Sequence, residues 1–356
     1  MQATVKQFCA LMARSRVLSV PQVRTVYRRW MREAGDRAAD LGRFTHWLVA
    51  THYLTAYQAE RLQHGHTDCL VLDQYKILRR IGEGPLARVY KAIQADGRAV
   101  ALKVLPPSRA ANPHLRTCFE REAQASWRLK HPNVVRTLGT GEADGVRYIV
   151  MEHLDGETLA EVLRRRGRLP PTEAVRLIYQ AFLGLQHIHE RGLVHGAVEP
   201  ANLMLTPAPR SASPDTTLHA TVKLLDVGAG PTFFAGLTQS AADRLRRTGE
   251  SALSVHVGSL APEQASDPAH SDIRADIYGL GCVLYHCLAG QPPFPGGGTV
   301  SQILRHATEA PQPLRAFDAT IPEGLQEVVD RLLAKDPAQR YPTPEAAARA
   351  LRRFLP

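Results

Sequence analysis

The sequence predicts an α+β protein in which a small all-helical module precedes a sheet-rich lobe and a helical lobe. Three observations support this class. Residues 1–70 have helical periodicity, residues 75–154 contain short segments of alternating apolar and polar residues, and residues 155–355 return to long helical patterns. With 356 residues, of which 44% are hydrophobic, the chain is long enough to bury more than one core.

The helical module contains an internal repeat of two helix-turn-helix units. The segment FCALMARSRVLSVPQV, which begins at Phe8, aligns with FTHWLVATHYLTAYQA, which begins at Phe44. In each copy Ser19 or Thr55 is followed three residues later by glutamine, which is a capping box that opens a second helix. One unit cannot bury its apolar face alone, so we expect the two to share a core. No cluster of Arg, Asn and Gln marks a recognition helix, which favours packing or protein docking over DNA binding.

The sheet-rich lobe is predicted from segments with a period of two residues. Turns at residues 82–84 and 95–97 separate the first segments, and one helix, LRTCFEREAQASWRLK (115–130), interrupts the lobe. A Pro/Ser/Thr-rich segment, 206–221, is expected to be a surface loop inserted in a hairpin of the helical lobe. The predicted strands are YKILRRIGEG (75–84), ARVYKAIQ (87–94), AVALKVL (99–105) and VRYIVMEHL (146–154).

Composition excludes several classes of protein. The formal net charge is +10, but the arginines are spread over the chain instead of forming one block with interleaved aromatics, so no nucleic-acid partner is expected. The five cysteines lack the paired spacing of a zinc site, which favours a reducing compartment. The longest apolar stretch, 278–288, is too short to span a bilayer, and no signal peptide is recognisable. We therefore expect a cytoplasmic protein without a membrane partner.

Several motifs with phosphate chemistry follow one another along the two lobes. Gly82 and Gly84 lie at a strand turn where bare backbone could cover a triphosphate. Lys103 follows on an alternating strand, and Glu122 on the next helix could pair with it and hold it toward phosphates. The later motifs are LVHGAVEPANLML (193–205), LLDVG with Asp226, APEQ with Glu263, DIYGLG with Asp276 and KDPAQRYPT with Arg340.

In their order and spacing, these motifs resemble the eukaryotic-like Ser/Thr protein kinases of bacteria over residues 75–355. The resemblance implies a two-lobed kinase fold, with an N-lobe over 75–154, a C-lobe over 155–355 and a cleft that takes ATP and Mg²⁺. It assigns the metal to Asn202 and Asp226. The residues that it assigns to the nucleotide are Gly82, Gly84, Val89, Ala101, Lys103, Glu122, Met151, Glu152 and Leu154.

Three further residues receive structural roles from the same resemblance, and Met151 receives a second role. Glu263 is expected to bond with Arg340, and Asp276 is expected to anchor the loop of residues 193–205. Met151 would be the gatekeeper at the start of a hinge over residues 151–154.

The catalytic residues themselves are not intact. His195-Gly196-Ala197 stands where the family has His-Arg-Asp, and the methyl group of Ala197 can neither accept a proton nor orient a hydroxyl. Loss of a general base alone costs roughly 10²- to 10⁴-fold in rate. Glu199 stands where the family has a lysine that contacts the γ-phosphate, and this charge reversal adds repulsion against the transferring group. Both changes affect the transfer step.

Other departures weaken the grip on phosphate and on substrate. Ala87 occupies the third glycine position and Pro85 removes an N–H donor from the loop tip. Val227 replaces the phenylalanine of Asp-Phe-Gly, and Gly196 replaces the arginine that would pair with a phosphorylated activation loop. The segment VHVGSL (255–260) lacks the Gly-Thr and Tyr that shape the peptide site of the family.

These observations predict a degenerate member, a pseudokinase that binds ATP and Mg²⁺ and serves as a scaffold or allosteric partner of another protein, with another kinase as one candidate. The alternative is a weakly active Ser/Thr kinase that uses Glu199 or another carboxylate as base, which would explain why Lys103, Glu122, Asn202 and Asp226 remain. A kinase-like fold without nucleotide is opposed by these four residues, because buried charges without a ligand need other partners. Nucleic-acid binding by the basic module would depend on charge alone.

Overall fold

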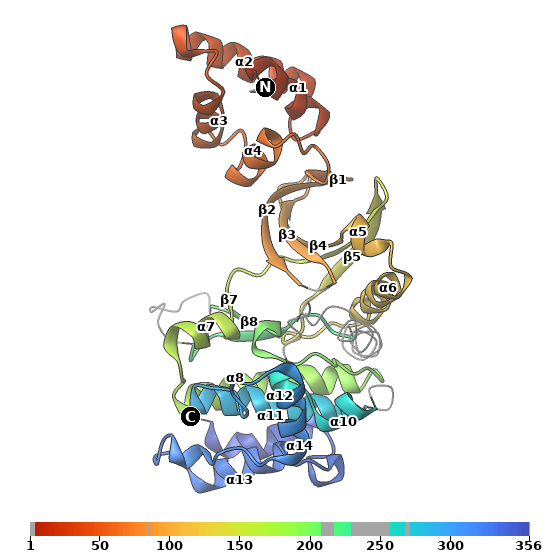
Figure 1. Ribbon diagram of the computed structural model, residues 1–356, viewed down its shortest axis with the longest axis vertical. Coiled ribbons are helices and arrows are strands. Elements are labelled where there is room, and N and C mark those ends of the chain that lie inside the picture. The colour runs from red at the N-terminus through yellow and green to blue at the C-terminus, as the bar shows by residue number, and fades with distance from the viewer. Residues whose placement is uncertain (1–3, 85, 208–216, 229–256, 268–270, 356) are drawn as a thin grey trace. The chain divides into compact units, whose positions relative to one another are not determined.

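The computed structural model describes residues 4–84, 86–207, 217–228, 257–267 and 271–355 (Figure 1). The chain divides into two compact units. The first unit contains Met1–Ala111 and Leu138–His153, and the second contains Asn112–Thr137 and Leu154–Pro356. The predicted class is confirmed, because helices precede a β-rich part that is followed by a mainly helical part.

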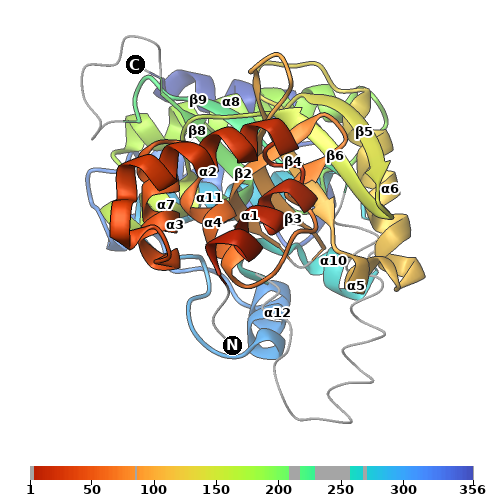
Figure 2. The same cartoon turned by 90° about the horizontal axis from the view of Figure 1, so that it is seen from above.

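Four helices form the N-terminal module, which Figure 2 shows from above. The expected capping boxes are present: the hydroxyls of Ser19 and Thr55 each accept a hydrogen bond from the backbone N–H of the glutamine three residues later. In return, their own backbone N–H groups donate to the side-chain oxygen of that glutamine. A third box at Thr4 opens the first helix. The helices are α1 (Val5–Arg14), α2 (Val20–Ala34), α3 (Leu41–Ala50) and α4 (Ala56–Gln63).

The two repeats share one core, as the sequence predicts. Phe8 and Phe44, the equivalent residues of the two copies, are both fully buried, and their ring centroids lie 6.1 Å apart. Trp30 of α2 packs against Phe44 at 5.4 Å and donates a hydrogen bond from its indole nitrogen to the Ala38 carbonyl oxygen. Burying these rings together removes apolar surface that neither copy could cover alone.

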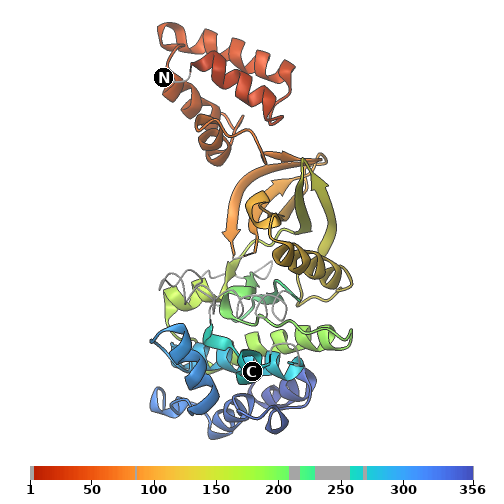
Figure 3. The same ribbon diagram turned by 45° about the vertical axis from the view of Figure 1, so that its right-hand side comes forward.

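A six-stranded sheet completes the first unit, in the order β1-β2-β3-β4-β6-β5. Figure 3 shows its strong curvature. One face of the sheet carries a buried cluster that includes Ile77, Tyr90, Leu102 and Tyr148. The strands are β1 (Val71–Leu72), β2 (Tyr75–Glu83), β3 (Arg88–Ile93), β4 (Ala99–Leu105), β5 (Thr137–Ala143) and β6 (Val146–Glu152), and α5 (Pro107–Ala110) follows β4.

The helical module is docked on this sheet through α4. The Thr55 hydroxyl donates a hydrogen bond of 2.6 Å to the Leu78 carbonyl oxygen, and the Gln58 side-chain nitrogen donates one of 2.6 Å to the Ile77 carbonyl oxygen. The register of β2 against β3 shifts at this point, which turns carbonyl groups of β2 out of the ladder. Thr55 and Gln58 therefore close the start of α4 and also bind the strand, and the sequence did not predict this docking.

The second unit contains most of the helices and a small sheet of β7 (Glu157–Thr158), β8 (Leu203–Thr206) and β9 (Thr221–Leu224). Its α-helices among the described residues are α6 (Pro113–Trp127), α7 (Leu159–Arg166), α8 (Pro171–His189), α10 (Pro262–Ser266), α11 (Ile273–Ala289), α12 (Thr299–Thr308), α13 (Glu323–Leu332) and α14 (Pro344–Leu351). Its short 3₁₀ helices among the described residues are η2 (Pro200–Asn202), η3 (Val257–Ser259), η4 (Leu314–Ala316), η5 (Pro337–Gln339) and η6 (Arg352–Phe354), while η1 (Gly35–Arg37) belongs to the first unit.

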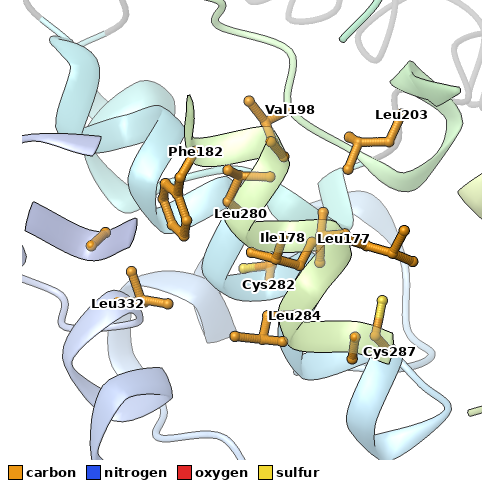
Figure 4. Packing of buried hydrophobic residues seen from close by; sticks show 14 of the residues in the cluster. Leu177, Ile178, Phe182, Val198, Leu203, Leu280, Cys282, Leu284, Cys287 and Leu332 are labelled. Atoms are coloured by element: carbon orange, nitrogen blue, oxygen red, sulfur yellow. The ribbon is translucent and has the colours of Figure 1, made fainter. Parts of the chain in front are cut away.

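The core of the second unit is centred on α8 and α11 (Figure 4). Glycines of α11 let neighbouring chains approach closely: a Cβ atom at Gly281 would lie 2.7 Å from the Cβ of Leu332 in α13. At Gly279 it would lie 3.0 Å from the Cβ of Val198, which belongs to the loop of residues 193–205. The helix thus supports this loop directly. Within the described parts of the chain, the helices all fall short of the length and apolarity that a bilayer crossing requires.

Candidate functional site

Five residues assigned to the nucleotide share one face of the six-stranded sheet. Gly82 lies opposite Val89, Val89 lies opposite Lys103, and Ala101 lies opposite Met151. Cross-strand partners point to the same side, and residues two apart on a strand do so as well. This face is the one opposite to the buried cluster around Tyr90 and Leu102.

The glycine turn between β2 and β3 is held by its own residues and by an arginine. The Gly84 N–H donates to the Ala87 carbonyl oxygen at 2.9 Å, so this donor is already used within the turn. Arg109, which follows β4, donates from Nη1 to the Gly84 carbonyl oxygen at 2.6 Å. Pro85, which was expected to weaken the grip on phosphate, lies outside the described residues. Both backbone polar groups of Gly84 thus have a hydrogen-bond partner within the chain.

The other nucleotide residues lie in different elements. Glu152 ends β6, where it is opposite Val100 and so faces away from Met151. Glu122 lies in α6 and is 3% exposed, and Leu154 begins the later part of the second unit. Lys103 in the first unit is also buried.

The loop of residues 193–205 is anchored from α11, as expected. Both carboxylate oxygens of Asp276 accept backbone hydrogen bonds of 2.7 Å, one from His195 and one from Gly196. Burial raises the pKa of Asp276 to about 7, although the two N–H donors act in the opposite direction. Gln264 of α10 donates to the Gly196 carbonyl oxygen at 3.1 Å, and Gly196 has a φ of +77°, which glycine adopts without strain. The loop backbone is therefore fixed on several sides.

Ala197 occupies the base position within this fixed backbone. Its N–H donates to Nδ1 of His195 at 3.3 Å, and its carbonyl oxygen accepts a hydrogen bond of 2.9 Å from Nδ2 of Asn202. Because the amide nitrogen of Asn202 is used in this way, its Oδ1 atom is left as the acceptor of that side chain. An amide oxygen so oriented is a suitable ligand for a hard cation.

Backbone hydrogen bonds bring Asp226 beside Asn202. The Leu225 N–H donates to the Asn202 carbonyl oxygen at 2.9 Å, and the Gly228 N–H donates to the His195 carbonyl oxygen at 3.2 Å. Asp226, between them, has a φ of +58°. Mg²⁺ is commonly held by one or two carboxylates, phosphates and water, so Asn202 and Asp226 fit a metal shared with a nucleotide. Residues 229–256, which follow, lie outside the description, as does the first part of VHVGSL.

The expected pair of Glu263 and Arg340 is confirmed. The Arg340 side chain is fully buried, and its guanidinium binds the two carboxylate oxygens of Glu263 at 2.5 and 2.8 Å. The remaining donors reach the backbone carbonyl oxygens of Arg274 at 2.8 Å, Ala334 at 2.8 Å and Lys335 at 3.1 Å. All five donor positions of the guanidinium thus have an acceptor.

Sequence reasoning missed two residues that position this machinery. Gln264 supports the loop at Gly196, and its only signal was its place directly after Glu263. Arg109 holds the glycine turn at Gly84 from 25 residues away, and no local pattern marks it.

A model of the protein kinase domain matches residues 75–351. The chain belongs to the protein kinase family. Serine/threonine-protein kinase PknB of Mycobacterium leprae is 35% identical over 276 residues, which are 76% of this chain and 41% of that protein. The probable serine/threonine-protein kinase PknB of Corynebacterium glutamicum is 35% identical over 295 residues, or 80% of this chain and 43% of that protein. The chain therefore spans less than half the length of these relatives.

Solved kinase structures support the same conclusion. The PknI kinase domain of Mycobacterium tuberculosis superposes with a TM-score of 0.59 at 28% identity, over 80% of this chain and 97% of that one. Helices α1 to α4 precede the segment that the kinase model matches. Members of the family use ATP and Mg²⁺.

Proposed function

We propose that this kinase domain is a pseudokinase, which binds ATP with Mg²⁺ and acts through contact with a protein partner instead of phosphate transfer. The observation that carries the proposal is the state of the loop around Ala197. The backbone of this loop is fully assembled by Asp276, Gln264 and Asn202, yet the side chain at the base position is a methyl group.

Phosphoryl transfer depends on positioning, on screening of charge and on a residue that receives the hydroxyl proton. Ala197 is held by hydrogen bonds at both its N–H and its carbonyl group. The loop backbone therefore cannot easily shift to place a neighbouring carboxylate at the position of the missing base. Glu199 is two residues away on extended backbone, with a φ of −153°. Misplacement of a catalytic group by about 1 Å can cost roughly 10²-fold, so Glu199 is a poor substitute for the missing base.

The retained residues favour nucleotide binding. Asn202 and Asp226 lie side by side and would hold Mg²⁺, which would screen the phosphate charge when bound. Lys103 and Glu122 are both buried, and buried charges are retained at a cost that a bound ligand can offset. This combination fits a protein that binds ATP but does not transfer its γ-phosphate efficiently.

A domain that does not transfer phosphate can still act by binding another protein, and another kinase is one candidate for this partner. Gly196 in place of arginine removes the positive charge that would receive a phosphate on the activation segment. Control by that phosphate would then be lost, so the state of the domain would depend on ligands and on partners.

Two measurements on the full chain test the proposal. ATP with Mg²⁺ should raise the melting temperature, because a ligand at 100 times its Kd adds about 2.7 kcal/mol to the folded state. The Lys103→Ala variant should show a smaller shift. In parallel, radioactive phosphate from ATP should enter neither a generic protein substrate nor the chain itself.

Two results would contradict the proposal in different ways. Phosphate incorporation that disappears in Lys103→Ala would show a weakly active Ser/Thr kinase. The absence of any thermal shift at millimolar ATP would show a kinase fold without nucleotide.

A further inference from the structure

A cavity of about 720 Å³ lies within the first unit, between α4 and the sheet. Helix α4 and the residues after it contribute Tyr57, Arg61 and His64, and the sheet contributes Arg80, Arg88 and Tyr90. In the sheet register Tyr90 lies opposite Arg80, and Arg88 lies opposite Val104. These residues therefore share the face that is turned away from Lys103. The cavity is a separate place from the nucleotide residues.

The charge of this cavity favours an anion. Four arginines line it, at positions 61, 79, 80 and 88, against the carboxylates of Glu60 and Asp68 in the lining and that of Glu83, which pairs with Arg80 and Arg88 from outside it. Arg61 pairs with Asp68 at 3.5 Å, while its Nε atom is buried and has no acceptor among the described residues. A buried donor without an acceptor is costly, so this guanidinium is not fully satisfied by the chain itself.

The cavity also has an aromatic wall. The rings of Tyr57 and Tyr90 lie 6.2 Å apart, and Val104, Pro106 and Pro107 add apolar surface. Burial raises the pKa of Tyr57 to about 12, so its hydroxyl stays protonated and can donate a hydrogen bond. Arginine forks beside aromatic rings match a ligand with a doubly charged phosphate and a flat apolar body.

We propose that this cavity binds a small phosphate monoester with an aromatic or apolar body. The guanidinium groups of Arg61, Arg80 and Arg88 bind the phosphate oxygens, and the ring of Tyr57 packs on the body of the ligand. The site exists because the helical module is docked on the sheet, since α4 supplies one wall. It does not depend on whether the domain transfers phosphate.

The same arginines connect the cavity with the glycine turn. Glu83, between Gly82 and Gly84, binds Arg80 at 2.6 Å and Arg88 at 3.0 Å. Their side chains are 37 to 50% exposed, and exposed pairs of this kind contribute little stability. A phosphate in the cavity can therefore compete with Glu83 for both arginines. Occupancy then releases one restraint on the turn, and removal of the Glu83 charge strengthens phosphate binding in return.

Titration calorimetry of the full chain with phenyl phosphate, in the absence of ATP, tests the site. We expect the wild-type protein to bind phenyl phosphate at least fivefold more tightly than inorganic phosphate. The double variant Arg61→Gln with Arg80→Gln should bind it at least tenfold more weakly. The double variant Arg98→Gln with Arg349→Gln is the matched control, because it also removes two positive charges, from side chains that are 82% and 73% exposed and lie outside the cavity lining.

Two further variants separate the cavity from the nucleotide site and test the connection. Lys103→Ala should leave the affinity for phenyl phosphate unchanged, and Glu83→Gln should raise it about threefold or more. The proposal is overturned if millimolar phenyl phosphate does not bind, if the two double variants bind it alike, or if Lys103→Ala abolishes binding. Equal affinity for phenyl phosphate and inorganic phosphate would refute a contribution of the aromatic wall to binding. An unchanged affinity for phenyl phosphate in Glu83→Gln would refute the connection with the glycine turn.

Discussion

Replacing Arg340 by lysine should strongly destabilise the second unit, although the charge is kept. The guanidinium of Arg340 fills five acceptors with its five donor positions, and its side chain is fully buried. A lysine ammonium has three donors and lacks the planar fork, so at least two of these acceptors lose their hydrogen bond. Glu263, which is 21% exposed, then keeps a partly buried charge with a poorer partner.

The size of the effect follows from these lost bonds. A hydrogen bond to a charged group contributes about 1.5 to 3 kcal/mol, so two lost bonds cost about 3 kcal/mol or more. In a unit of this size, 1 kcal/mol changes the melting temperature by about 2 to 4 °C, so we expect a decrease of at least roughly 6 °C.

Differential scanning calorimetry can measure this decrease, with Arg349→Lys as the matched control. Arg349 also pairs with a glutamate, Glu345, but at 3.2 Å on the surface of α14, where its side chain is 73% exposed. Surface pairs of this type contribute about 0.3 to 0.5 kcal/mol, so the control should change the melting temperature very little. If both variants melted alike, the buried fork would not be the source of stability and the reasoning would be wrong.

Three other perturbations test separate parts of the structure. Ala197→Asp with Glu199→Lys should give partial phosphate transfer in a radiometric assay, because it restores the catalytic base and the lysine that contacts the γ-phosphate but not the other altered residues. The absence of any transfer would show that these two side chains are not what limits activity. The pKa of Asp276 is raised from its ordinary 3.8 to about 7, so its contribution to stability is present at low pH and is lost as the pH rises from about 4 to about 7. The urea midpoint of the wild type should therefore fall over this range relative to that of Asp276→Asn and level off above it, and parallel pH profiles would contradict this. Gln58→Leu should weaken the hold of α4 on β2 by about 1 to 3 kcal/mol and speed amide exchange in that strand. Gln22→Leu, which removes the equivalent side-chain cap without a strand contact, should leave exchange in β2 unchanged, and equal exchange in both variants would refute the docking.

Strong local signals made much of the fold predictable. The capping boxes at Ser19 and Thr55 fixed the starts of α2 and α4, because a cap is formed by residues three positions apart. The strand β5 was missed, since TLGTGEA is rich in glycine and threonine and alternates weakly. A usable signal was nevertheless present: Asp144-Gly145 forms the turn after β5 with φ angles of +53° and +74°, as expected of an Asp-Gly hairpin.

Contacts between distant residues could not be read from local patterns. Arg109 holds Gly84, and Gln264 holds Gly196, only because the fold brings these segments together. The family resemblance predicted the role of Asp276, whereas the two N–H groups that it binds could be identified only in the structure. The docking of α4 could not be predicted for the same reason, because a capping sequence does not indicate which carbonyl groups the remaining side-chain donors of Thr55 and Gln58 will bind.

The shared core of the two repeats limits where the chain can be shortened. Deleting the first repeat would strip Phe8 and Trp30 from the ring of Phe44 and expose the inner side of α3 and α4 to water. A protease that cuts between the repeats should therefore loosen all four helices together. In an N-terminal truncation series, stable proteins should be those that keep the whole helical module or lack all of it, and proteins cut within the module should be less stable.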